Sequence, residues 1–449
     1  MKRIITILAA LLLGSTVLSN AQGFQTGYFL DNYSYGYRIN PALQSDRSFL
    51  GLAINNMTET AQSNVGLSNF VFNTGGKLVT GLNSAVNSAQ FLSGLPDKSA
   101  ISLDVSESIL AAGVWKKGVL HTLEINSRTL GNVALPKDLF AFAKNGSSAT
   151  PYDLAGLGGV IQSYFEIAYG YSRKINEMVT VGGRVKFLIG AASVNMTTDK
   201  FSILPKEDQW SVSTNANINV AGQFLSVPTD NGSLNWQNMK FLRSLTPSGF
   251  GAALDLGVTV KPIEGLTVTA ALVDIGGISW KYNIAGRANG ETSFTGVDNL
   301  DLENGGGSAI SDSFKDLLTI ADFKPVAGKS AFEGLPLTVN LGARYQIPNV
   351  NFLSVGLISS YGSFHGVSSF NARLGATLTP VNWFSFAASA GTGNFGPNGG
   401  AAISINAGPL ALHLGFETYF GKLSKQMVPL NKFRETVSLG ITLRFGERH

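Results

Sequence analysis

From residue 334 onward, apolar and polar residues alternate in one short run after another. In the final run, apolar residues alternate with small or polar ones: Val437, Ser438, Leu439, Gly440, Ile441, Thr442, Leu443, Arg444 and Phe445. A period of two is typical of a β-strand with one apolar face. Because the other face is small and polar, it suits a wet lumen better than a packed core. The pattern therefore predicts an all-β protein, a transmembrane antiparallel β-barrel with lipid outside and water inside.

Short turns and long connections alternate along the chain. Tight turns that contain Pro, Gly or Asn are predicted at residues 116–118, 175–177, 261–265, 347–349, 380–382 and 407–409. The connections between these hairpins are longer and rich in Gly, Ser and Asn. In bacterial barrels the short turns face the periplasm and the long loops face outward. The turns therefore predict which end of the barrel faces the periplasm.

This rule predicts about fourteen strands, with sixteen as an alternative. We expect them at residues 48–56, 99–116, 119–128, 163–174, 178–204, 249–262, 265–285, 334–347, 350–361, 367–380, 383–392, 398–407, 409–421 and 434–446. An even number suits a single-chain barrel whose two ends both lie in the periplasm. Apolar and polar residues also alternate along residues 209–222. No further strand is predicted that could pair with this segment and keep the number of barrel strands even. We interpret this segment as an extracellular extension of the barrel wall.

Residues 1–21 are predicted to form a cleaved signal peptide. Lys2 and Arg3 provide a basic start, and residues 4–13 form an apolar stretch that is too short to span a bilayer as a helix. Small residues precede Gln22 at the positions that a signal peptidase reads. The alternative is a retained N-terminal anchor. Export by this route leads us to expect the protein in the cell outer membrane of a Gram-negative bacterium.

Residues 22–47 are too irregular for a barrel strand, so we expect a short N-terminal plug segment inside the barrel of residues 48–449. Four long extracellular loops are predicted, at residues 57–98, 129–162, 205–248 and 286–333. Each contains a short helix-like apolar stretch, at residues 78–86, 139–142, 239–245 and 314–320. The loops could fold over the mouth as a lid, or their apolar faces could take up a hydrophobic ligand.

The composition excludes several classes of protein. The 449 residues contain no cysteine, which rules out a lipoprotein anchor, disulfides, thiolate metal sites and cysteine nucleophiles. The net charge of +4 falls by two to +2 when Lys2 and Arg3 are removed, so no nucleic-acid partner is implied. No later stretch is apolar for long enough to form a transmembrane helix.

No enzymatic site, metal site or cofactor is expected. The four histidines have no metal-ligand spacing. A barrel lipase would need a Ser–His pair near the outer rim, and His365 beside Ser363 or Ser368 is only a loose candidate. The glycine-rich runs lack the Lys-Ser or Lys-Thr of a phosphate-binding loop.

Alternation also assigns polar residues to the inner face of the barrel. With the apolar set facing outward, the lumen receives Asp104, Glu166, Arg184, Lys186, Asp255, Asn340, Arg344, Asn371, Arg373, His413, Glu417 and Arg444. These charges either pair across neighbouring strands as a structural ladder, which the cost of burying unpaired charge favours, or form a constriction that selects solutes. Candidate lumen residues for function are Arg184, Asp255 and Glu166. Arg344 and Arg373 are the best candidates for a filter, because rings of arginine tune anion passage in pores.

Two short motifs precede the first predicted strand: Tyr-Phe-Leu-Asp-Asn-Tyr at residues 28–33, and Asn40-Pro41-Ala42. Together with the signal peptide and a glycine-rich barrel, they make the whole mature chain resemble a family of uncharacterised Bacteroidetes-type outer-membrane barrel proteins. Asn40-Pro41-Ala42 also resembles, more distantly, an element in the N-terminal plug of long-chain fatty-acid outer-membrane transporters of the FadL type. That resemblance implies a fourteen-stranded barrel with an N-terminal hatch that passes hydrophobic molecules. The plug is shorter here, and no residues match a fatty-acid pocket.

The expected function is passive, porin-like transport of small hydrophobic or amphipathic compounds, with residues 28–43 as the gate. Tyr28, Phe29 and the motif Asn40-Pro41-Ala42 are the candidate gate residues. Two alternatives stay open. One is a non-transporting interaction barrel that serves secretion or surface assembly, like the secretion-accessory barrels of the same superfamily. The other is a structural barrel with a blocked lumen.

The expected partners follow from the barrel. Outer-membrane lipid surrounds it, and a small hydrophobic molecule is its expected ligand. The barrel-assembly machinery commonly recognises a terminal aromatic residue, and Phe445 fits this role although four residues follow it. We expect a monomer.

Overall fold

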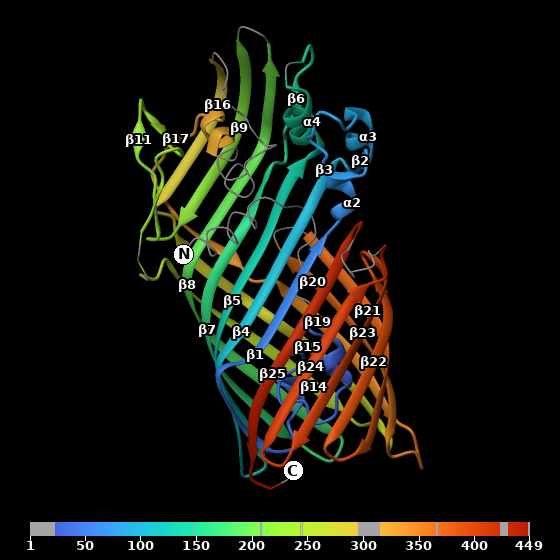
Figure 1. Cartoon of the computed structure of the whole chain (residues 1–449). Helices are drawn as coiled ribbons and strands as arrows, with labels where there is room; N and C mark the ends of the chain where they lie inside the picture. Colours follow the sequence, from blue (N-terminus) through green and yellow to red (C-terminus); the bar gives the residue numbers. More distant parts are fainter. Residues whose placement is uncertain are drawn as a thin grey trace.

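The computed structural model is a closed antiparallel β-barrel with an outer lobe at one end (Figure 1). It describes residues 23–146, 148–206, 209–242, 244, 246–294, 315–364, 367–422 and 430–447. In this part of the chain, fourteen strands form the ring: β1 (Ser48–Ser63), β4 (Lys98–Lys116), β5 (Val119–Pro136), β7 (Gly158–Lys174), β8 (Val179–Pro205), β14 (Gly249–Val260), β15 (Leu266–Lys281), β19 (Leu337–Gln346), β20 (Leu353–Phe364), β21 (Val367–Val381), β22 (Phe384–Gly393), β23 (Gly396–Ala407), β24 (Leu410–Tyr419) and β25 (Phe433–Phe445). The ring closes because β1 pairs with both β4 and β25.

The predicted fold class is confirmed, and each of the fourteen predicted strands corresponds to one strand of the ring. β9 (Trp210–Ala221) is the predicted extension of the wall, but it does not lack partners. It pairs with the outer part of β8, which has 27 residues, and with β16 (Ile284–Phe294). β8 therefore continues beyond the ring and carries a small sheet outward. The predicted signal peptide and His365 lie outside the described residues.

The directions in which the side chains of β25 point show that its alternating pattern belongs to a membrane barrel. Its apolar side chains point outward, and Leu439 and Leu443 are 47% and 49% exposed. Its polar side chains point inward, and Thr436 and Ser438 are fully buried. A water-soluble sheet has the opposite arrangement, so the outer surface of this ring suits lipid. Among the described helices, none is both long and apolar enough to cross a membrane.

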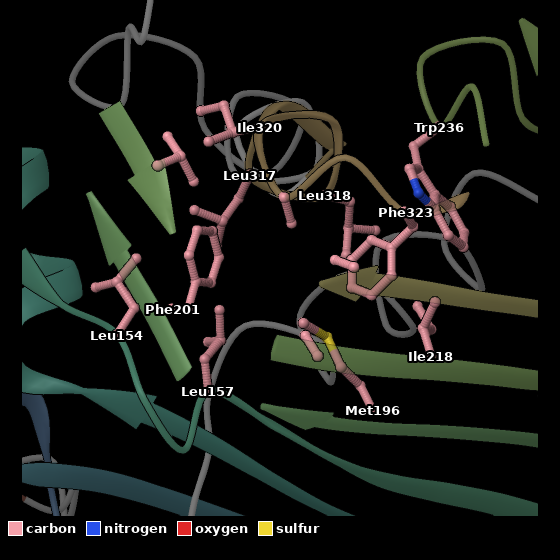
Figure 2. Close-up of a cluster of buried hydrophobic side chains, with 14 of the residues drawn as sticks. Leu154, Leu157, Met196, Phe201, Ile218, Trp236, Leu317, Leu318, Ile320 and Phe323 are labelled. Carbon is pink, nitrogen blue, oxygen red and sulfur yellow. The ribbon is translucent and has the colours of Figure 1, made fainter. Parts of the chain in front are cut away.

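The long outer connections fold into a packed lobe. It contains the following short elements: α2 (Leu67–Phe70), β2 (Val71–Thr74), β3 (Lys77–Thr80), α3 (Ser88–Ser93), α4 (Lys137–Asn145), β6 (Tyr152–Asp153), β10 (Leu225–Ser226), β11 (Thr229–Asp230), β12 (Ser233–Leu234), β13 (Lys240–Phe241), β17 (Lys324–Pro325) and β18 (Ser330–Gly334). Figure 2 shows its largest apolar cluster, in which Phe201, Trp236 and Phe323 are buried. The lobe therefore has a hydrophobic core of its own.

The helix-like stretches of the lobe are confirmed in part. α4 covers residues 139–142, and residues 315–320 are also helical. The other two helix predictions are wrong where the chain is described, because Leu78 lies in β3 and Phe241 in β13. Each of these strands pairs with a neighbouring short strand. A stretch this short cannot nucleate a helix alone, so backbone pairing decides its structure.

We predict that Leu439→Arg destabilises the barrel by about 2–4 kcal/mol, because it places a charge midway along the lipid-facing side of β25. The matched control is Leu78→Arg, since Leu78 is 76% exposed on the outer lobe. The control should change the free energy of unfolding by less than about 0.5 kcal/mol. Urea unfolding in lipid vesicles, followed by tryptophan fluorescence, measures both variants. Equal losses would contradict the assignment of this face to lipid.

Candidate functional site

Residues 23–47 run inside the ring, and we call them the inner segment. The segment includes two 3₁₀ turns, η1 (Thr26–Phe29) and η2 (Gly36–Arg38), drawn in blue behind the front strands of Figure 1. Its aromatic side chains are buried, and Phe29 is only 1% exposed. Phe29 packs where Gly375 of β21 leaves room, since a Cβ there would lie 2.6 Å from the Phe29 ring. The inner segment therefore packs closely against the inner wall.

The start of the inner segment is fixed to Glu417 of β24. The backbone N–H and the hydroxyl of Thr26 both donate to this carboxylate, at 2.7 Å each. The Gln25 side-chain oxygen accepts hydrogen bonds from Asn371 at 2.6 Å and from Arg373 at 3.2 Å. Arg373 also pairs with Glu417 at 3.3 Å. These contacts form the first anchor of the inner segment.

The second anchor is Asp31. Its carboxylate pairs with Arg344 of β19 at 2.5 Å and accepts a hydrogen bond from Thr379 of β21. Arg344 and Arg373 therefore face inward, as predicted, and both bind the inner segment. This is the geometry of side chains that hold a segment in place, and their role as a filter stays a prediction.

The Asn40-Pro41-Ala42 motif is held by the polar groups of Asn40. The Asn40 side-chain nitrogen donates to the carbonyl oxygens of Val258 on β14 and Ala270 on β15, at 3.1 and 3.2 Å. Its side-chain oxygen accepts the N–H of Ala42 at 2.8 Å, which closes a tight local turn. One side chain thus shapes the motif and binds it to two strands.

Two glycines of the wall make room for this motif. A Cβ on Gly257 of β14 would lie 2.0 Å from the side-chain oxygen of Asn40. A Cβ on Gly182 of β8 would lie 2.3 Å from the backbone carbonyl of Pro41. Any larger residue at either position would push the motif away from the wall.

A bulge in β1 also contacts the inner segment. Ala53 and Ile54 both have a φ of 50°, and pairing with β4 and β25 is interrupted up to Asn56. The bulge places Asn55 inside, where its side-chain oxygen accepts the Tyr35 hydroxyl at 2.6 Å. The inner segment therefore supports an irregular part of the wall.

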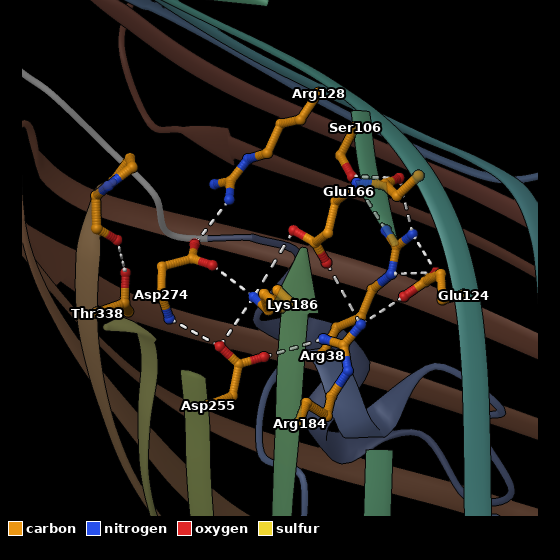
Figure 3. Close-up of polar contacts among 12 residues, drawn as sticks. Arg38, Ser106, Glu124, Arg128, Glu166, Arg184, Lys186, Asp255, Asp274 and Thr338 are labelled. Carbon is orange, nitrogen blue, oxygen red and sulfur yellow. Dashed lines mark hydrogen bonds and ion pairs between the residues drawn. The ribbon is translucent and has the colours of Figure 1, made fainter. Parts of the chain in front are cut away.

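A network of ion pairs joins the inner segment to the opposite wall (Figure 3). Arg38 of the inner segment pairs with Glu124 of β5 at 2.5 Å, and Glu124 pairs with Arg184 of β8 at 2.8 Å. The pairs continue along the wall: Arg184–Asp255 at 3.1 Å, Lys186–Asp255 at 2.8 Å, Lys186–Asp274 at 2.5 Å, Arg128–Asp274 at 2.7 Å and Arg128–Asp104 at 3.0 Å. Charges thus pair between strands, as the structural ladder predicts. Arg38 is the third anchor of the inner segment.

The lumen is layered along the barrel axis. A polar cavity of about 110 Å³ lies between the ion-pair network and the inner segment, lined by Tyr33 on one side and Glu166 on the other. Further toward the outer rim, an apolar cluster follows, in which Tyr164, Leu188 and Trp280 are fully buried. The apolar layer therefore lies between the outer lobe and the charged layer.

Three polar side chains at the outer rim donate to one carboxylate. Glu333 of β18 accepts hydrogen bonds from Gln162, Asn195 and Tyr282. Burial and the adjacent Glu333 carboxylate raise the pKa of the Tyr282 phenol above its usual value, so the phenol stays protonated and donates.

The residues assigned to the lumen from the sequence do lie on the inner side, but the set was incomplete. Sequence reasoning missed Glu124, Arg128 and Asp274. Glu124 follows the outward-facing Leu123, so the alternation along the strand predicts that Glu124 faces inward. Arg128 lies four residues further on and therefore faces the same side as Glu124. The alternation of inward and outward residues could not place Asp274. This residue has a φ of 65° and lies where the pairing of β14 and β15 shifts register. This bulge turns it inward.

The fold and the lumen define a transmembrane β-barrel that holds its own N-terminal segment inside. The chain belongs to DUF5723, a family of unknown function whose profile matches residues 41–417. Membership agrees with the resemblance to uncharacterised barrel proteins expected from the sequence. No curated protein matches the chain.

Several solved structures are similar to the chain at low identity. The Ralstonia pickettii toluene transporter TbuX is 9% identical, with 95% of this chain and 100% of that chain covered and a TM-score of 0.49. A Pseudomonas aeruginosa FadL homologue is 11% identical, with 96% and 100% covered and a TM-score of 0.47. The P. putida toluene transporter TodX is 9% identical, with 93% and 95% covered and a TM-score of 0.45.

We predict that Gly257→Ala displaces Asn40 and Pro41 from the wall, because the added Cβ overlaps the Asn40 side chain. Stability should fall by about 1–3 kcal/mol, and amide hydrogen exchange should rise at residues 39–43. The matched control is Gly131→Ala on β5, where the nearest atom to a Cβ is 3.8 Å away. Hydrogen exchange followed by mass spectrometry compares the variants. Unchanged protection of residues 39–43 in Gly257→Ala would show that the motif does not depend on this close approach.

Proposed function

We propose that the protein is an outer-membrane transporter through which small hydrophobic or amphipathic compounds diffuse, with the inner segment as its gate. The observation that carries this proposal is the inner segment itself. It occupies the lumen without forming part of the wall, and side-chain contacts fix it at Glu417, Arg344 and Glu124. Such contacts can break and form again while the ring stays intact.

The apolar layers support a solute with an apolar part. The outer lobe buries a cluster that includes Phe201, Trp236 and Phe323. The apolar layer around Trp280 follows inside the outer half of the ring. A porin for hydrophilic solutes has a polar interior at this depth. Apolar side chains that repack around a ligand are the usual lining of sites for small hydrophobic molecules.

The charged layer supports a gated rather than an open path. The cavity at this level has a volume of about 110 Å³, whereas pockets for drug-sized ligands have about 300–1,000 Å³. A solute of that size needs the inner segment to move. Arg38 is the suitable point of release, because its ion pair with Glu124 is the contact that joins the segment to the network.

Further parts of the proposal concern the cell. The predicted signal peptide directs export, residues 22–47 act as the plug, and the barrel-assembly machinery inserts the strands with Phe445 at the end of β25. Tyr28 and Phe29 move with Asn40-Pro41-Ala42 when the gate opens. The protein works as a monomer, without a cofactor or a catalytic site.

We predict that Arg38→Ala speeds the uptake of a lipophilic probe several-fold, because it removes the third anchor and leaves Glu124 with Arg184 alone. Loss of one partner of a buried ion pair costs about 3–5 kcal/mol, which would loosen the inner segment. The matched control is Arg47→Ala, since the Arg47 guanidinium has no ion pair in the described part of the chain. Uptake of N-phenyl-1-naphthylamine by whole cells measures the rate, because phospholipid vesicles pass such probes unaided.

Single-channel recording with and without residues 23–45 separates the transporter from its alternatives. A conducting pore after deletion, together with faster probe uptake, supports the gate. A pore after deletion without any probe uptake in either form indicates a structural barrel whose lumen is blocked. No conductance and no uptake in any variant would favour an interaction barrel and overturn the transport proposal.

A further inference from the structure

The end of the barrel that carries the short turns lies opposite the outer lobe (Figure 1). Two neighbouring hairpins at this end, β4–β5 and β7–β8, carry four exposed cations: Lys116, Lys117, Arg173 and Lys174. None of these cations has an ion pair in the described part of the chain, and Glu177 is the one carboxylate that their two turns contain. Across the ring, the turns at residues 347–352, 380–384 and 407–410 contain no charged residue. The exposed charge of this end is therefore concentrated on one side.

The remaining charges at this end do not cancel that excess. Among the described residues, they are Arg47, Lys261, Glu264, Glu447 and the ion pairs Arg444–Asp46 and Arg344–Asp31. These groups are four cations and four carboxylates. The two hairpins therefore keep an excess of positive charge, which attracts an anionic partner.

Strand pairing brings two of these cations into one row on the lipid-facing side. Val119 of β5 pairs with Lys116 of β4 and, on its other side, with Arg173 of β7. Each cation lies two residues from an outward-facing side chain, Val114 on β4 or Tyr171 on β7, and these are 45% and 40% exposed. Because adjacent strands are about 4.8 Å apart, the backbones of the two cations are about 10 Å apart, and both long side chains can reach one phosphate group.

An aromatic row follows, two residues further along the wall. It contains His121 of β5 and its partner Tyr171 of β7. Their rings meet edge to face with 5.7 Å between the centroids, and His121 Nδ1 is hydrogen-bonded to the Tyr169 hydroxyl at 2.7 Å. Rows of aromatic residues mark the level of the lipid headgroups in membrane barrels. The aromatic row therefore places Lys116 and Arg173 at the depth of the lipid phosphates.

Beyond the aromatic row, the outer surface of the wall is apolar. Leu123, Phe165 and Ile167 are 43%, 41% and 38% exposed. From the turns toward the middle of the wall, the order is cations, aromatic rings and apolar side chains. A phospholipid has its phosphate, its esters and its acyl chains in the same order. An anion without acyl chains would use only the first of these levels.

We propose that one anionic glycerophospholipid of the periplasmic leaflet, such as phosphatidylglycerol, binds here with its headgroup against Lys116, Arg173, His121 and Tyr171. The Arg173 guanidinium and the Lys116 ammonium bind the phosphate, because both donate charge-assisted hydrogen bonds to its oxygens. His121 and Tyr171 lie beside the ester groups, and the acyl chains lie along Leu123. The assignment to this leaflet rests on the predicted orientation, in which the short turns face the periplasm. The site does not depend on the proposed transport function.

Native mass spectrometry of the full mature barrel in detergent tests the site by titration with phosphatidylglycerol and with phosphatidylcholine of identical acyl chains. We expect the wild type to bind phosphatidylglycerol more tightly than phosphatidylcholine. Lys116→Gln/Arg173→Gln should bind phosphatidylglycerol about 25-fold more weakly, at about five-fold for each cation near an anionic headgroup. The matched control is Lys77→Gln/Lys240→Gln, which removes two exposed cations from the outer lobe and should bind as the wild type does.

A charge-conserving variant separates the loss of charge from damage to the fold. Lys116→Arg/Arg173→Lys keeps both cations and should still bind phosphatidylglycerol, and heat-modifiable migration in gel electrophoresis identifies the folded barrel of each variant. Equal losses in the two glutamine variants would show that only net charge matters. Equal binding of both lipids by the wild type would show that the headgroup is not recognised, and displacement of phosphatidylglycerol by an equal concentration of inorganic phosphate would assign the cations to a free anion. Each of these three results would overturn the proposal.

Discussion

The ion pair between Arg38 and Glu124 joins two structures that would otherwise be independent. Glu124 belongs to the wall and Arg38 to the inner segment, and both are largely withdrawn from water. Through Glu124 the contact extends to Arg184 and then to Asp255, so a residue of the first forty is coupled to strands that lie far along the chain. The wall needs this contact as much as the segment does. Without Arg38, Glu124 would keep Arg184 as its one ion-pair partner among the described residues.

This coupling follows from the inverted facing of a membrane barrel. Lipid on the outside forces the polar side chains of each strand inward, where burial makes every unpaired charge costly. The inner segment supplies part of the pairing with Arg38 and Asp31, and it supplies apolar filling with Phe29 and Tyr35. The lumen is therefore closer to the core of a folded domain than to a channel, and its polarity is organised in layers.

The ring could be predicted from the sequence because membrane facing imposes a strict parity. Leu439 and Ser438 differ by one position and lie on opposite faces, and the same rule holds along the regular strands. Parity fails where the backbone is irregular. Asp274 lies inside because the register shifts beside it, and Asn55 lies inside because the β1 bulge turns it. Both residues contact the charged or aromatic groups of the candidate site.

Contacts between distant segments were the other part that the sequence could not provide. Asn40-Pro41-Ala42 was recognisable as a motif in the sequence. The residues around it do not indicate that it packs against Gly182 and Gly257. Likewise, Arg344 and Arg373 were correctly placed inside, yet their partners Asp31 and Gln25 come from a segment with no periodic pattern. A pattern predicts which face a residue occupies, whereas its partner depends on the tertiary fold.

The anchors of the inner segment differ in their access to water, and this difference would order their release in the proposed gate. Thr26 and Glu417 are buried, the Arg38 side chain is 18% exposed and borders the polar cavity, and the Arg344 and Asp31 side chains are 21% and 32% exposed. Water can replace an ion pair at lower cost where it already reaches the charges. A gate that opens in steps would therefore separate at the Asp31–Arg344 pair first and at Arg38 next, and it would keep its Thr26 end attached. The path that the proposed gate would open in this way runs beside paired charges, which would disfavour a wholly apolar solute but offer hydrogen bonds to an amphipathic one. If the barrel transports as proposed, its charged layer would favour amphipathic solutes, a selectivity that the apolar outer lobe alone could not give.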